Sequence, residues 1–155
     1  MAVVAHAFPY LSQNAASKVV NLNNTDTLQV LLIASSSAAY TWNATAEGNQ
    51  FVHDLFVTGS GSALTEVSGG SYSRKTLTSV TLATSGLVTT LTCANPSWAA
   101  STISATYAFF FDSQSGADTT DPLLCYWDFG GTQSTTSATF TLTISGSGLV
   151  TWTAS

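Results

Sequence analysis

Turn signals punctuate this sequence at intervals of roughly ten residues, and that spacing leaves room only for short extended segments. The segments between the turns are rich in Thr, Val and aromatic residues, which favour strands, and helix signals are nearly absent. We therefore expect one all-β domain, an antiparallel β-sandwich or jelly-roll-like domain of about 8–10 short strands. The expected strands are Lys18–Leu22, Thr27–Ala34, Ala63–Val67, Ser71–Val80, Leu87–Cys93, Thr102–Phe111, Pro122–Phe129, Ala138–Ile144 and Leu149–Thr153.

Two stretches repeat one local pattern, a Thr-rich strand, a Ser-Gly turn and a second strand. They are VTLATSGLVTTLT (80–92) and FTLTISGSGLVTWT (140–153). A short Gly-containing loop between alternating strands predicts a β-hairpin, so we expect one at each place.

The two ends of the chain differ in pattern. Residues 1–18 are apolar and lie outside the strand pattern, so we expect an N-terminal arm that needs a partner to become ordered. Residues 19–155 are expected to form the single β-sandwich domain. Within it Thr27–Ala34 is almost continuously apolar, which predicts a strand buried on both faces. The segment Glu47–Val57 could be a short helical turn or extended chain, and we expect it to be irregular.

Charge is scarce, and that excludes some classes of partner. Charged residues make up 7% of the chain, against about 25% in a typical soluble domain, and the net charge is −5. The only cations are Lys18, Arg74 and Lys75, too few to neutralise phosphates, so nucleic acid is excluded and an anionic membrane is disfavoured. Polarity comes instead from 25 Thr and 22 Ser. Burying a hydroxyl costs far less than burying an ion, so such a surface suits assembly with other proteins.

The stretch YAFFFDSQSGADTTDPLLCYWDFGG (107–131) holds half of the acidic residues, Asp112, Asp118, Asp121 and Asp128. Its loop lacks the spacing of a calcium-binding loop. In a hairpin, Asp112 and Asp128 would be separated by about 20 Å, which is too far for paired acid–base catalysis. We therefore expect a central hairpin with DSQSGADTTD as its exposed tip. Phe110 points away from Phe109 and Phe111, which suggests core on one face of the strand and a neighbouring subunit on the other.

The remaining candidates for chemistry are weak. His6 and His53 have no partner at metal-ligand spacing, and Ser residues lack the context of a nucleophile. Cys93 and Cys125 lie in apolar segments and are expected to be buried free thiols rather than a disulfide. We expect no catalytic, cofactor or metal site.

The start of the chain has no basic region before its apolar residues, so we expect synthesis in the cytoplasm without a signal peptide. Aromatic residues that could stack on sugars are Tyr40, Trp42, Trp98, Tyr126, Trp127 and Trp152, although core positions are commoner for such side chains.

Four motifs in order carry a family resemblance. They are TEVSGGSYSRKTLTSVT, PSWAASTISATYAFFFD, DPLLCYWDFGG and ATFTLTISGSGLVTWT. This order resembles a family of small virion-associated proteins of tailed bacteriophages, common in phages of actinobacteria, over residues 28–153. The Phe-rich strand departs from the aliphatic pattern of that family. Members are found among head and head–tail structural proteins and are not characterised as enzymes.

The resemblance implies a structural virion protein, most simply a capsid decoration or minor capsid protein on the capsid surface. Its partners would be the major capsid protein and other virion proteins, with self-association as a homo-oligomer, for example a trimer. A tail or head–tail connector protein and a carbohydrate-binding module for host attachment remain as alternatives. The residues expected to contact partners are Phe8, Tyr10, Phe110, Asp118, Asp121 and Trp127.

Overall fold

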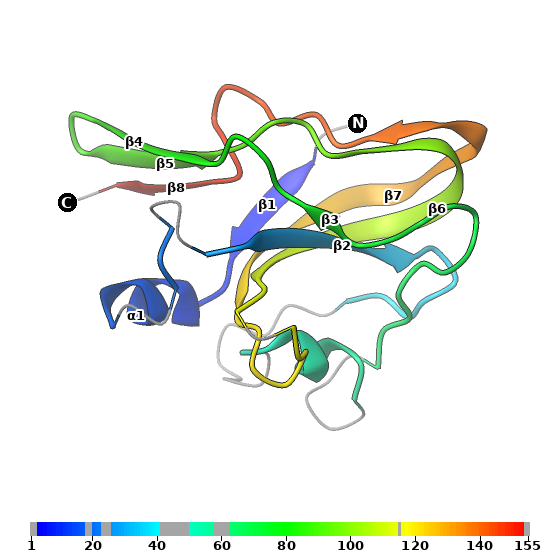
Figure 1. The fold of residues 1–155 in the computed structure, drawn as a ribbon, viewed down its shortest axis with the longest axis horizontal. Coiled ribbons are helices and arrows are strands. Elements are labelled where there is room, and N and C mark those ends of the chain that lie inside the picture. Colours follow the sequence, from blue (N-terminus) through cyan, green and yellow to red (C-terminus); the bar gives the residue numbers. More distant parts are fainter. Residues whose placement is uncertain are drawn as a thin grey trace.

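The computed structural model describes residues 3–17, 20–22, 26–40, 50–57, 63–114 and 116–153. These residues form two antiparallel sheets, so the all-β, sandwich-like fold expected from the sequence is confirmed (Figure 1). The larger sheet has the order β1-β7-β6-β2-β3 and the smaller one the order β4-β5-β8. The strands are β1 (Val4–Ala7), β2 (Leu28–Ala34), β3 (Lys75–Thr76), β4 (Thr81–Ser85), β5 (Val88–Thr92), β6 (Ser97–Asp112), β7 (Leu123–Thr141) and β8 (Val150–Thr153), and the helices are α1 (Tyr10–Ala16) and the 3-10 helix η1 (Val52–Leu55).

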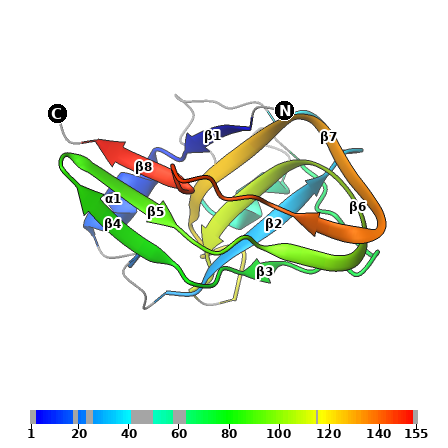
Figure 2. The ribbon, with the colours of Figure 1, turned by 90° about the horizontal axis from the view of Figure 1, so that it is seen from above.

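The hairpin of β6 and β7 forms the centre of the larger sheet, as the aromatic stretch predicts. Phe109 pairs with Tyr126 and Phe110 with Cys125. The two strands have 16 and 19 residues, so they are not short. The register shifts several times along them, and Gly130 and Gly131 both have positive φ. Bulges and glycines let a strand pair bend, and Figure 2 shows the distal half of this hairpin curving round toward the smaller sheet.

The N-terminal arm is not separate from the domain. β1 pairs with β7 in antiparallel register, Ala5 opposite Trp127 and Ala7 opposite Cys125. α1 follows, with Leu11 1% exposed in the core. The expectation of an arm outside the sheet was wrong, because four residues of the β1 segment find backbone partners along the edge of β7.

Only one of the two predicted hairpins forms. β4 pairs with β5, which confirms the first. The second was wrong: β8 pairs with β5 in the smaller sheet, while β7 stays with β6 as far as Thr141. Residues 142–149 cross from one sheet to the other. This crossing needs Gly148, since a Cβ there would lie 2.4 Å from the carbonyl oxygen of Leu91.

The shorter predicted strands are only partly confirmed. Thr27–Ala34 corresponds to β2 and is buried along both faces. Ala63–Val67 contributes a single bridge, between Glu66 and Ile33, and Ser71–Val80 contributes only the two residues of β3. Residues 18 and 19 of the first predicted strand lie outside the described residues, and Val20–Leu22 is not extended in a sheet. The irregular segment before Val57 contains η1.

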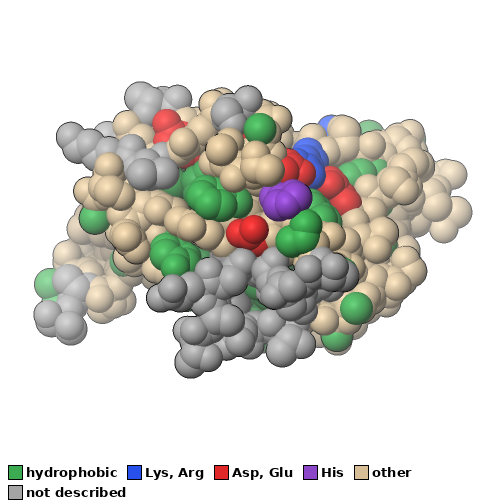
Figure 3. Space-filling view, turned by 90° about the horizontal axis from the view of Figure 1, so that it is seen from below, with side chains coloured by type: hydrophobic (Ala, Val, Ile, Leu, Met, Phe, Trp, Pro, Cys, Tyr) green, Lys and Arg blue, Asp and Glu red, His purple; other side chains and the backbone are tan. Residues whose placement is uncertain are grey.

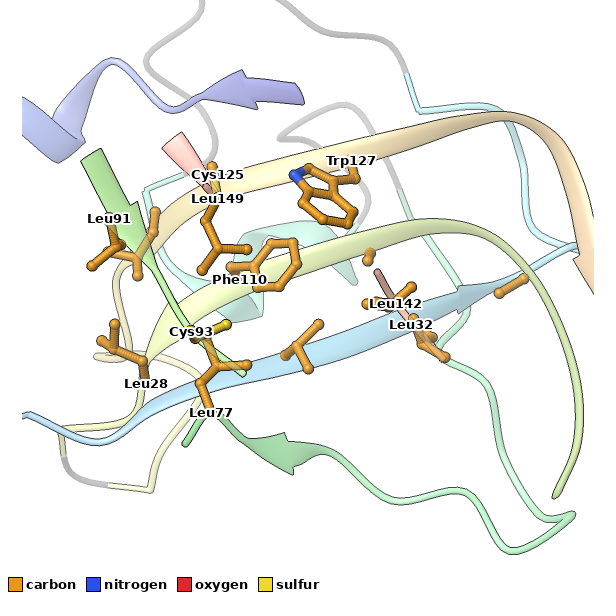
Figure 4. Close-up of a cluster of buried hydrophobic side chains, with 14 of the residues drawn as sticks. Leu28, Leu32, Leu77, Leu91, Cys93, Phe110, Cys125, Trp127, Leu142 and Leu149 are labelled. Atoms are coloured by element: carbon orange, nitrogen blue, oxygen red, sulfur yellow. The ribbon is translucent and has the colours of Figure 1, made fainter. Parts of the chain in front are cut away.

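The core has two parts, one on each face of the larger sheet. The inter-sheet cluster lies between the sheets and includes Leu91, Phe110, Trp127 and Leu149 (Figure 4). Trp98 also belongs to it. Both cysteines belong to it as free buried thiols, as expected. The outer-face cluster lies on the opposite face, where η1 and neighbouring loops cover it. Its members include Phe8, Leu31, Ile33, Val52, Leu55, Phe109, Phe111 and Tyr126.

Candidate functional site

Charged side chains gather around the loops that cover the outer-face cluster (Figure 3). Three of them form one ion-pair network, in which Arg74 lies between Glu66 and Asp118. Arg74 follows the turn 68–71 and precedes β3, Glu66 forms the bridge to β2, and Asp118 lies in the loop between β6 and β7. We call these three residues the Arg74 clamp.

The clamp uses the whole guanidinium group. Nη1 and Nη2 of Arg74 donate to the two Asp118 oxygens at 2.5 and 2.9 Å, while Nε and Nη2 donate to Glu66 at 2.8–3.2 Å. The guanidinium also lies 5.5 Å from the centre of the Phe111 ring. The hydrogen bonds that Arg74 donates to Asp118 and Glu66 raise its pKa, so it stays charged. Because both carboxylates already occupy its donors, the Arg74 guanidinium links two loops and is not available to bind an anion.

Two aromatic residues of the sequence motifs, Tyr72 and Trp98, lie beside this clamp and act as framework. The Tyr72 hydroxyl donates to Glu66 at 2.8 Å and accepts from the Leu32 amide at 2.9 Å. Burial raises the pKa of Tyr72, so its hydroxyl keeps its proton. The Trp98 indole donates to the carbonyl of Ser73 at 2.7 Å. These contacts fix the turn between β2 and β3 against the sheet.

A second acidic group lies at the start of the same loop. Asp112 is 0% exposed, its Oδ2 accepts from Gln114 Nε2 at 3.0 Å, and its carboxyl group lies against that of Asp26. Burial, with Asp26 next to it, raises the pKa of Asp112 to about 7. In the described residues no group of three or more His, Cys, Asp and Glu side chains is arranged to hold a metal ion.

A groove separates the start of β1 from the chain around β8, at the side of the sandwich where both strands are sheet edges. It has a volume of about 590 Å³. We call it the β1–β8 groove. The lining residues used below are Val3, Ala5, Ala7, Trp127, Ser147 and Leu149. Trp127 is 6% exposed, and its indole nitrogen is buried without a hydrogen-bond partner.

The outer face of the smaller sheet carries no charged side chain. The register places Ala83, Thr90 and Thr151 in one row across β4, β5 and β8, and Ser85, Val88 and Thr153 in the next. Leu91 lies on the opposite face, in the inter-sheet cluster, so these rows face outward. Residues 76–111 and 129–155 contain no charged residue. The fold brings these two uncharged stretches together at this sheet.

Most residues expected to contact partners serve the domain itself. Phe8 is 3% exposed, Phe110 0%, Asp121 1% and Trp127 6%, so these four side chains pack mainly within the chain, and their contact with partners stays a prediction. Both faces of the Phe-rich strand are covered within the chain, because η1 and the loops close the second face. Asp118 is half-buried in the clamp rather than free at an exposed tip, and Tyr10 is half-buried at the start of α1.

The aromatic residues considered for sugar stacking do not form a platform among those described. Trp98, Tyr126 and Trp127 are buried, and Tyr40 packs edge-on against Tyr126. Trp152 is half-buried, and Trp42 lies outside the described residues.

Comparisons with protein-family models, with curated proteins and with solved structures found no match for this chain. The part of the chain that the structure describes contains no helix long and apolar enough to cross a membrane.

Sequence reasoning missed the Arg74 clamp, the Asp26–Asp112 pair and the β1–β8 groove. One signal was present for the clamp: in a chain with three cations, an Arg beside buried strands needs acidic partners. The groove had no signal, because it depends on two distant strand edges facing each other.

Proposed function

We propose that the chain is a structural protein of a tailed bacteriophage particle, a capsid decoration or minor capsid protein that binds and stabilises the lattice of the major capsid protein. The motif resemblance suggests the virion, and one observation of the fold carries the binding role. This observation is the exposed, uncharged and hydroxyl-rich outer face of β4, β5 and β8.

The chemistry of that face favours burial against protein. A Thr or Ser hydroxyl loses little on leaving water if it finds one hydrogen bond, whereas a Lys or Glu side chain loses far more. Regular rows on a sheet offer a flat surface that a repeating lattice can meet in the same way at every site. Many copies on one shell also restrict one another's dissociation, so weak contacts are sufficient. The function is binding without turnover.

The test combines location with surface variants. Quantitative mass spectrometry and a cryo-EM map of phage particles that encode the chain should show it on the capsid in hundreds of copies. Six, twelve or a few dozen copies at the tail or neck would instead indicate a connector or tail protein. Absence from the particle would contradict the virion role.

The surface assignment needs its own variants. Ala83→Lys and Thr153→Lys place a charge on the outer face of the smaller sheet, and both positions are exposed. We expect each to lower occupancy on capsids lacking the native protein by about tenfold, since a buried unpaired charge costs at least about 1.4 kcal/mol. Thr119→Lys makes a similar change on the exposed loop near the clamp and should bind as the parent does. Equal occupancy for all three variants would exclude this face as the capsid contact.

A further inference from the structure

Exposed large apolar side chains occur at two places in the described part of the chain. Leu82, Leu87 and Val88 lie on the hairpin of β4 and β5, and Val3 and Val4 lie at the start of β1. The first place projects and the second borders a hollow. An exposed apolar projection and an uncharged hollow bordered by apolar side chains are features through which copies of one chain can contact each other.

The projection is the turn of the β4–β5 hairpin. Leu87 is 67% exposed at this turn, next to Gly86, whose φ is +60°. Figures 1 and 2 show the turn at one end of the molecule, reaching past the rest of the smaller sheet. The hairpin carries no charge, so it can enter an apolar site without leaving an ion unpaired.

The hollow is the β1–β8 groove. Small side chains at Ala5 and Ala7 leave its floor open, and His6 is the only titratable residue among those that line it. Its volume of about 590 Å³ falls in the range of sites that bind ligands. The Trp127 ring lies under the groove, and in Figure 4 its nitrogen edge is turned toward the side on which Leu149 lies. The indole N–H is covered by the chain itself, so it reports on what fills the groove rather than donating to it.

We propose that the β1–β8 groove receives the β4–β5 hairpin turn of a second copy of this chain. Leu87 of one copy packs against Val3, Ala5 and Ala7 of the other, above the ring of Trp127. Both surfaces are uncharged, so the contact leaves no ion unpaired. The contact is measured on purified protein, so it does not depend on the virion role.

The geometry of this contact has a consequence for assembly. The turn and the groove are different surfaces, so the contact is head-to-tail rather than two-fold symmetric. Such a contact leaves a free turn at one end of a pair and a free groove at the other. Copies then close into a ring or continue as a chain.

A crosslinking experiment tests the pairing directly. Leu87→Cys and Ser147→Cys proteins are prepared separately, mixed and oxidised, with the native cysteines remaining buried. Ser147 lines the groove. The proposal requires the mixed disulfide dimer as the main product and little product from either protein alone. A Leu87→Cys homodimer as the main product would show turn-to-turn contact and overturn it, as would an absence of crosslinks at millimolar protein.

Sedimentation velocity on the full chain measures the energy of the same contact. Leu87→Glu should weaken self-association about tenfold or more, the loss expected when one leucine side chain is withheld from burial. Ala5→Phe, which fills the groove, should weaken it to a similar extent. Thr119→Glu changes charge equally on a distant loop and should associate like the parent. A monomeric parent protein, or a Leu87→Glu variant that associates normally, would overturn the proposal.

The indole proton gives a readout that a general loss of stability would not move. Its NMR signal is assigned by comparison with Trp127→Phe. On raising the protein concentration this signal should shift, because the turn of the second copy changes the surroundings of the Trp127 ring. An unchanged indole signal in an associated sample would place the contact elsewhere.

Discussion

Asp112 shows what the fold does to a single residue. Its carboxyl group is fully buried beside Asp26, with Asp121 also nearby, and it accepts a hydrogen bond from Gln114. Burial and the neighbouring carboxyl of Asp26 both disfavour the charged form of Asp112, so its pKa is raised to about 7. The scarcity of acids in this chain made the loop look like a site, whereas the buried pair is a feature of its stability.

This pair predicts an unusual dependence of stability on pH. The pKa of Asp112 is raised from 3.8 to about 7, so folding takes up a proton between these values. The free energy of unfolding should therefore keep its full value below about pH 4 and fall as the pH rises through about 7. The total loss is up to about 4 kcal/mol. Asp112→Asn should remove this slope and be more stable than the parent at pH 8 in urea unfolding.

Asp128→Asn is the matched control, since it makes the same change of charge at a half-exposed position. It should keep most of the slope of the parent. Parallel stability curves for the parent and Asp112→Asn between pH 4 and 8 would contradict a proton held at Asp112.

Gly69 and Gly70 allow the cost of an unfavourable φ to be compared with the cost of a steric clash. Gly69 and Gly70 both have positive φ, at +71° and +58°. A Cβ at Gly70 would lie 2.3 Å from the carbonyl oxygen of Thr102, whereas one at Gly69 would meet nothing within 4 Å. In urea unfolding Gly69→Ala should cost about 1 kcal/mol and Gly70→Ala about 3 kcal/mol or more. Equal costs would mean that the turn moves freely away from β6.

At the scale of elements, the loops over the outer-face cluster depend on the Arg74 clamp. The amides of Val52 and His53 donate to the carbonyls of Asp121 and Asp118. η1 is therefore hydrogen-bonded to the β6–β7 loop, which the Arg74 clamp holds in place. Because the three side chains are partly exposed, solvent screening limits what the ion pairs add to overall stability. Their main effect is to hold these loops in one arrangement.

Arg74→Lys tests this role of the clamp. A lysine keeps the charge but cannot form the forked hydrogen bonds to two carboxylates. The free energy needed to open these loops locally should therefore fall by about 1–2 kcal/mol. In hydrogen exchange the amides of Val52 and His53 should exchange about tenfold faster, while that of Phe110 stays protected. Lys75→Gln removes the neighbouring cation and should leave exchange at η1 unchanged. Parent-like exchange in Arg74→Lys would show that the outer-face cluster alone holds η1.

At the scale of the whole molecule, one sheet is shared by two cores. Neighbouring residues of β6 enter different clusters: Phe110 enters the inter-sheet cluster and Phe109 the outer-face cluster. A strand buried on both faces couples the layers on either side of it. We expect the two clusters to unfold together rather than one after the other.

Phe109→Ala and Phe110→Ala test this coupling. Each removes a fully buried ring and should lower the free energy of unfolding by about 3–5 kcal/mol. Amides near Leu55 and near Leu91 report on the two sides. For each variant both sides should lose protection equally. Loss confined to the side of the substituted ring would show two independent cores.

The pattern along the chain was sufficient for the features that depend on neighbouring residues. The β class, the turn at Gly86 and the central hairpin through Phe110 and Cys125 were all predicted, because alternation and turn chemistry act over a few residues. The burial of Thr27–Ala34 on both faces also followed from its composition. For the site, the sequence pointed to the loop that contains Asp118, but not to the role of that residue.

Tertiary structure alone decided which distant segments meet. β8 lies beside β5 rather than β7, β1 forms an edge of the larger sheet, and Arg74 contacts acids from two other segments. Backbone hydrogen bonding is the same for every strand, so local sequence does not specify which strand a segment will pair with. That choice follows from how the whole set of side chains fills two clusters at once, and the uncharged sheet and the groove are its results.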